Sequence, residues 1–110
     1  MSIYYLEHDI ENIKGKRNGE FYMIENFKPG IRVEVKLAYL AILNTLVDKA
    51  SFNEHQEAYL KIDSDYLAKR LGTLANKKVD ADKIQSYMIE LAELDLLDIK
   101  QDGLYLRRMI

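Results

Sequence analysis

The longest apolar segment of the chain covers residues 33–49 and reads VEVKLAYLAILNTLVDK. Its apolar positions cover most of the circumference of a helix, and a helix that is apolar nearly all round lies in the centre of a hydrophobic core. We therefore expect a central core helix here, ending near residues 50–53.

Two shorter helices are predicted further along the chain. Apolar residues at helical spacing follow the N-cap signal Asp63-Ser64, and Gly72 is expected to end this helix. The next helix is expected to begin after its cap Asp80 and to end near Asp95. Its apolar residues form one stripe: Ile84, Tyr87, Met88, Leu91 and Leu94.

Alternating apolar and polar residues predict a short strand and a hairpin. Residues 58–62, AYLKI, have the period of a half-buried strand. Residues 97–107 alternate on both sides of Asp102-Gly103, which fits a tight type I′ turn. In that register Ile99 faces Leu106, and both lie on the buried side of the hairpin.

Residues 1–30 are expected to form an N-terminal arm or hairpin that packs on a domain formed by residues 31–110. Asn18-Gly19 separates two apolar runs, at residues 3–6 and 21–24, and Asn-Gly between such runs indicates a hairpin. The two runs either pair as strands, or the first is a loose arm.

From residue 33 onward the predicted order is helix, short strand, helix, helix and hairpin, which is the order of a winged helix-turn-helix domain. The segment DSDYLAKRLG at 63–72 resembles the second helix of this superfamily. The segment MIELAELDLLDIKQDGLYLR at 88–107 resembles its third helix and wing. The resemblance implies an α+β fold that is mainly α, with a small β-sheet.

Three segments also resemble a narrower family, the N-terminal domain of plasmid and phage replication initiators from Gram-positive bacteria. They are FYMI at 21–24, KLAYLAILNTLVDKA at 36–50 and the segment that leads to YLKI at 59–62. This resemblance implies a DNA-binding protein that acts in plasmid or phage replication initiation or in transcriptional regulation.

Docking of the third helix in the major groove of double-stranded DNA would place basic side chains on phosphates and amide or hydroxyl groups near base edges. Residues 69–78 contain four basic residues and no acidic one. The expected DNA-binding residues are Lys69, Arg70, Lys77, Lys78, Lys83, Gln85, Ser86, Lys100 and Arg107.

The charge balance supports an alternative, a winged-helix module that contacts protein and does not bind DNA. The formal net charge is −2, and residues 63–110 contain 8 basic and 9 acidic side chains. Asp80 and Asp82 lie where the third helix would meet an anionic groove. Residues 73–79 also form a longer connection than the turn of about 3–4 residues that is usual for the helix-turn-helix motif.

Aromatic residues are concentrated in the N-terminal third, namely Tyr4, Tyr5, Phe21, Tyr22 and Phe27. They either form a dimerisation or partner surface or cover the first core helix, because a small domain needs large side chains to close its core. We expect a homodimer for the DNA-binding protein.

Composition excludes several other classes. The 110 residues are 48% hydrophobic, which suits one small folded domain rather than a disordered chain, and they include no cysteine for disulfides or thiolate metal sites. Glu7, His8 and Asp9 interrupt the N-terminal apolar run, so we expect a cytoplasmic protein without a signal peptide or membrane segment. His8 and His55 lack neighbours at metal-ligand spacing, and no catalytic motif is present, so we expect neither a metal, a cofactor nor an enzyme activity.

Overall fold

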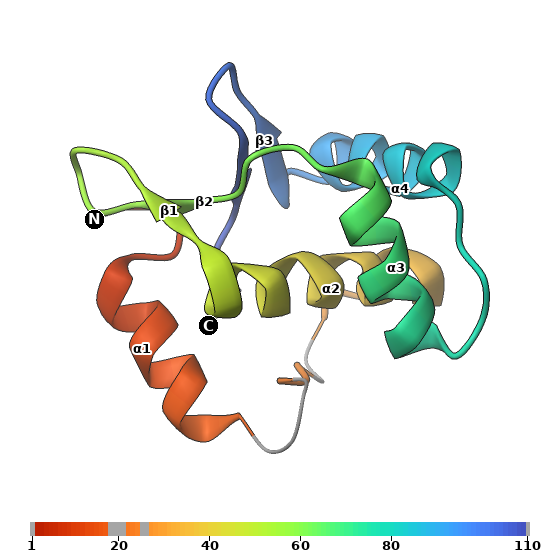
Figure 1. Ribbon diagram of the computed structural model, residues 1–110, viewed down its shortest axis with the longest axis horizontal. Helices are drawn as coiled ribbons and strands as arrows, with labels where there is room; N and C mark the ends of the chain where they lie inside the picture. The colour runs from red at the N-terminus through yellow and green to blue at the C-terminus, as the bar shows by residue number, and fades with distance from the viewer. Residues whose placement is uncertain (1, 18–21, 25–26, 110) are drawn as a thin grey trace.

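The computed structural model describes residues 2–17, 22–24 and 27–109. The helix α2 (Val33–Lys49) lies at the centre of the fold, and the other elements pack around it (Figure 1). Every residue from 38 to 47 is buried, so this part of the helix is covered on all sides. The helix α1 (Glu7–Lys16) packs on one side of α2, and α3 (Ser64–Ala75) and α4 (Ala81–Glu93) pack on the other. The predicted central core helix is confirmed.

The predicted N-caps of α3 and α4 are both present. Asp63 accepts a hydrogen bond of 3.0 Å from the Tyr66 N–H, and Asp80 accepts one of 2.8 Å from the Lys83 N–H. Each carboxylate satisfies an amide of the first turn that has no partner within the helix. These two bonds fix where the helices begin.

The prediction that Gly72 ends α3 is wrong. The helix continues to Ala75, and Asn76 closes it in the left-handed conformation with φ of 56°. A Cβ atom at Gly72 would lie 2.8 Å from the Lys77 carbonyl oxygen. Glycine is therefore needed here because the chain after α3 passes close to the helix.

Two short antiparallel hairpins complete the fold, and one isolated bridge joins them. Strand β1 (Ser51–Phe52) pairs with β2 (Ala58–Tyr59), and β3 (Leu97–Ile99) pairs with β4 (Leu104–Leu106). Leu60 and Leu104 exchange backbone hydrogen bonds of 3.0 and 2.7 Å. The segment after α2 therefore meets the last hairpin, and β1 in this segment was not anticipated.

The register of the last hairpin differs by two residues from the prediction. Ile99 pairs with Leu104, and Leu106 pairs with Leu97. The turn lies one residue earlier than predicted, because Lys100 and Gly103 exchange backbone hydrogen bonds of 2.9 and 3.2 Å around it. Ile99 is 49% exposed, so its predicted burial is wrong too.

The position of Gly103 accounts for the difference between the predicted and the observed register. A Cβ atom there would lie 2.2 Å from the Leu60 carbonyl oxygen, and the residue has φ of +155°. Gly103 is thus the place where the backbone of residue 60 approaches β4, and not a corner of a type I′ turn.

The N-terminal region contains the helix α1, which was not predicted. Ile10 and Ile13 of this helix are buried. Tyr4 forms an isolated bridge with Arg107, and Leu6 forms one with Glu57, so residues 3–6 do not pair with residues 22–24. The proposed turn at Asn18-Gly19 lies outside the described residues.

The fold is mainly helical with small antiparallel sheets, which confirms the predicted α+β class. In the described ranges, no helix is both long and apolar enough to cross a membrane.

Candidate nucleic-acid interface

A groove lies between α3 and the start of α4, and it contains part of the predicted DNA-binding patch. Its volume is about 820 Å³, and its lining includes Gly72 and Val79. Three of the expected basic residues line it, Lys69, Lys77 and Lys78. The long connection after α3 therefore lies next to α3 and brings separate parts of the basic run together.

The three lysines that line this groove are exposed, and Lys83 is a fourth exposed lysine, in the first turn of α4. Among the described residues, no carboxylate lies within ion-pair distance of any of them. Their ammonium groups are therefore available to a ligand with negative charge.

Carboxylates also lie on this face. Asp65 and Asp80 line the groove, and Asp82 is exposed in the first turn of α4. The carboxylate of Asp80 accepts the hydrogen bond from the backbone of Lys83, so one of its oxygens points into the helix end. The face therefore combines lysines with acidic side chains, as the charge balance of the sequence indicates.

The predicted base-contacting residues are exposed on α4. Gln85 donates a hydrogen bond of 3.2 Å from Nε2 to Oγ of Ser64, the first residue of α3. Ser86 is exposed beside it, and Ile89 lies one turn further along the same side with 56% of its surface exposed.

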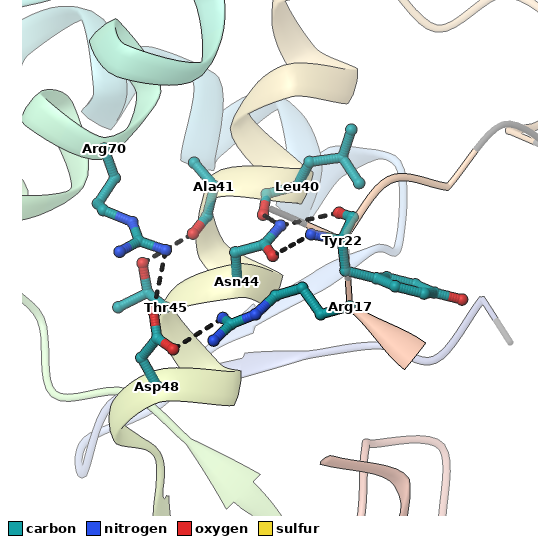
Figure 2. A network of polar contacts seen from close by, with 8 residues as sticks. All are labelled: Arg17, Tyr22, Leu40, Ala41, Asn44, Thr45, Asp48 and Arg70. Carbon is teal, nitrogen blue, oxygen red and sulfur yellow. Dashed lines mark hydrogen bonds and ion pairs between the residues drawn. The ribbon is translucent and has the colours of Figure 1, made fainter. Parts of the chain in front are cut away.

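Arg70 is separated from the lysines, although it follows Lys69 in the sequence. Its side chain is only 14% exposed, and Nη2 lies 3.1 Å from Oδ2 of Asp48 on α2. Arg17 binds the other oxygen of the same carboxylate at 2.7 Å, so Asp48 joins two arginines (Figure 2). Arg70 thus holds α3 on α2 rather than facing the groove.

The last predicted contacts, Lys100 and Arg107, belong to the β3–β4 hairpin and its exit. Arg107 donates two hydrogen bonds, of 3.0 and 3.2 Å, to the carboxylate of Asp98. These bonds are the main reason why the pKa of Asp98 lies below its usual value. Lys100 places its Nζ 4.7 Å from the ring centre of Tyr4 and 4.5 Å from that of Tyr105.

Asn44 is a structural residue inside the helix that was predicted to be apolar nearly all round. It is fully buried, and its side chain accepts a bond of 2.5 Å from the Tyr22 N–H and donates one of 2.9 Å to the Tyr22 carbonyl (Figure 2). It therefore holds residue 22 against α2. The available signal was a single amide inside an otherwise apolar helix, because buried polar groups need partners.

The two histidines lie on the surface, His8 3.4 Å from Asp9 and His55 3.6 Å from Glu54. Within the described ranges, no three side chains of the metal-binding types come together.

Comparison of the chain with protein-family models, with curated proteins and with solved structures finds no significant match.

Proposed function

We propose that the chain is a winged-helix protein that binds double-stranded DNA in replication initiation or transcriptional regulation. The observation that carries this proposal is a set of four exposed lysines: Lys69, Lys77 and Lys78 line one groove, and Lys83 lies in the first turn of α4. Lysine ammonium groups neutralise phosphates and release the counterions that surround them.

The proposed contacts divide into two kinds. The four lysines hold phosphates, and Gln85 and Ser86 on α4 approach base edges in the major groove. Arg70 and Arg107 leave the predicted contact set because they are bound to Asp48 and Asp98. With three to five contacts, about −0.9 per contact gives a slope of log affinity against log salt of about −3 to −4.5.

A homodimer belongs to this proposal as a way to strengthen weak binding. Two linked copies engage DNA with an effective local concentration that one copy lacks. A two-fold dimer would also place two copies of α4 about one helical turn apart on DNA.

One observation favours a second function, a module that contacts protein. Ile89 is 56% exposed on the side of α4 that also carries Asp82 and Glu93. An apolar side chain between carboxylates suits a protein surface better than a phosphate backbone.

Duplex selection at low salt, with light scattering on the same sample, distinguishes the two functions. For the selected duplex, fluorescence anisotropy across a salt series then compares the parent with Lys77→Gln/Lys78→Gln. The slope is expected to flatten by about 2, because each phosphate contact contributes about 0.9.

The matched control is Lys14→Gln/Lys16→Gln, which removes the same charge from exposed positions of α1. It is expected to keep the slope of the parent. Equal slopes for the parent and the Lys77→Gln/Lys78→Gln variant contradict DNA binding through this face and favour the protein-contact function.

A further inference from the structure

Three tyrosine rings form a row: Tyr59 comes from β2, Tyr105 from β4, and Tyr4 from the N-terminal end of the chain. The ring centres of Tyr59 and Tyr105 are 5.2 Å apart, and those of Tyr105 and Tyr4 are 5.0 Å apart. Tyr4 belongs to residues 2–6, which we call the N-terminal arm. The arm thus supplies the last ring of the row.

The side chain of Tyr4 contacts charges of both signs on the hairpin. Its ring lies 4.7 Å from Nζ of Lys100, and its hydroxyl donates a bond of 2.6 Å to Asp98. The negative face of an aromatic ring attracts an ammonium group, and here Tyr105 adds a second ring at 4.5 Å. Lys100 is therefore held on the hairpin by two rings.

Backbone hydrogen bonds on both sides fix the arm in this position. The Arg108 N–H donates to the carbonyl of Ile3 at 2.8 Å, and the Ala58 N–H donates to the carbonyl of Tyr5 at 2.8 Å. Tyr4, between these two bonds, is 6% exposed. The ring contact with Lys100 thus depends on arm docking.

We propose that Tyr4 is a latch that keeps Lys100 away from DNA, so that the docked latch and a phosphate contact by Lys100 exclude each other. The inference rests on the proposed function, because DNA is the partner that competes for the ammonium group. Arg107 is bound to Asp98 by two hydrogen bonds that do not involve the side chain of Tyr4. Lys100 is accordingly the cation that becomes available to a phosphate when Tyr4 leaves the hairpin.

Four variants of the full chain test the latch by anisotropy with one mixed-sequence duplex across a salt series. Tyr4→Leu removes the ring and the hydroxyl, and it is expected to bind more tightly at low salt with a slope steeper by about 0.9, the value of one phosphate contact. Tyr4→Phe keeps the ring over Lys100 and is the matched control with the slope of the parent. Lys100→Gln alone, and Tyr4→Leu/Lys100→Gln, are also expected to keep the parent slope.

Two results overturn the latch. One is a folded Tyr4→Leu variant with the slope of the parent, with folding checked by circular dichroism. The other is a slope that Lys100→Gln flattens by about 0.9 in the parent background, because Lys100 would then already contact DNA. The second result is decisive even where Tyr4→Leu does not fold, since Lys100 is exposed and tolerates glutamine.

Acetylation of lysines by a small amine-reactive reagent, read by mass spectrometry, separates this inference from the proposed function. A parent chain without salt-dependent DNA binding contradicts the proposed function. The latch contact itself then stands if Lys100 is acetylated faster in Tyr4→Leu than in the parent and Tyr4→Phe, with Lys77 as internal reference. Equal rates in all three proteins overturn it.

Discussion

The hydroxyl groups of Tyr5 and Tyr39 lie 2.7 Å apart in the fully buried centre of the domain. Tyr39 donates its proton to the Arg107 carbonyl at 2.6 Å, so Tyr5 is the donor between the two hydroxyls. The Met109 N–H then donates to the Tyr5 hydroxyl at 3.3 Å. The pKa of both tyrosines is raised, mainly by burial, so both hydroxyl groups stay protonated and neutral. It joins the arm, α2 and the residues after β4.

Tyr39→Phe tests this network. The change leaves the Tyr5 hydroxyl and the Arg107 carbonyl without their buried partner, so we expect a loss of about 1–3 kcal/mol in the free energy of unfolding. Urea denaturation followed by circular dichroism measures it. Tyr59→Phe is the control, because its ring stacks on Tyr105 at 5.2 Å and is half-buried. A Tyr39→Phe loss no larger than that of the control contradicts the network.

Local patterns predicted where α3 and α4 begin, because the causes lie within a few residues, but they did not predict α1. Asp63 and Asp80 each cap an amide three residues ahead, and such signals are visible in the sequence. The two glycines were misread for the opposite reason. Gly72 and Gly103 are needed where distant backbone approaches, at Lys77 and at Leu60, and turn rules contain no information on such contacts.

The candidate site divides in the same way. The four lysines are exposed, and no carboxylate in the described part of the chain pairs with them; three of them belong to the basic run 69–78 that the sequence shows. Arg70 was expected beside them, but its partner Asp48 comes from a different helix, 22 residues away by their numbers in the sequence. Ion pairs between elements depend on packing, so a sequence pattern alone does not show them.

Leu91→Ala tests the predicted stripe of α4. Leu91 is fully buried, and its truncation is expected to cost about 2–5 kcal/mol, the sum of lost burial and of the cavity that remains. Chemical denaturation gives the value. Ile89→Ala, on the same helix but 56% exposed, is expected to change stability by less than about 0.5 kcal/mol. Similar losses for both variants would mean that the register of α4 is wrong.

Gly103→Ala tests the close approach of residue 60. A methyl group would lie 2.2 Å from the Leu60 carbonyl oxygen, at a φ of +155° that alanine rarely adopts. Strain and overpacking together are expected to cost at least about 2 kcal/mol. Gly15→Ala is the control of opposite sign, because nothing lies within 4 Å of its Cβ position in α1 and alanine favours the helix. Thermal unfolding compares the three proteins, and an unchanged melting temperature in Gly103→Ala contradicts the contact.

The ion pair of Asp98 predicts how stability responds to acid. The pKa of Asp98 is lowered in the folded state, mainly by the hydrogen bonds from Arg107 and further by the Tyr4 hydroxyl. Its stabilising effect is therefore complete above the pKa of the unfolded chain, about 3.9, and is lost as the pH falls through the folded value. We expect Asp98→Asn to reduce stability at pH 7 and to flatten the decline of the unfolding free energy below about pH 5.

Urea titrations at a series of pH values measure this decline. Asp82→Asn removes the same charge from an exposed position of α4, with no side-chain partner among the described residues, and is expected to keep the parent profile. A profile of Asp98→Asn parallel to that of the parent over the acid range would show that the pair with Arg107 does not form.

The neighbours Lys69 and Arg70 give the sharpest test of which cations face DNA. Lys69 lines the groove, whereas the side chain of Arg70 is 14% exposed and lies 3.1 Å from Asp48. Lys69→Gln is therefore expected to flatten the slope of log affinity against log salt by about 0.9, and Arg70→Gln is expected to leave it unchanged. Both changes remove one positive charge, so a difference between them reports position rather than net charge. Anisotropy is measured well below the melting temperature of each variant, because loss of the Asp48 contact lowers the stability of Arg70→Gln. If Arg70→Gln flattens the slope as much as Lys69→Gln does, DNA binds on the side of α3 that faces Asp48, and the groove is not the phosphate site.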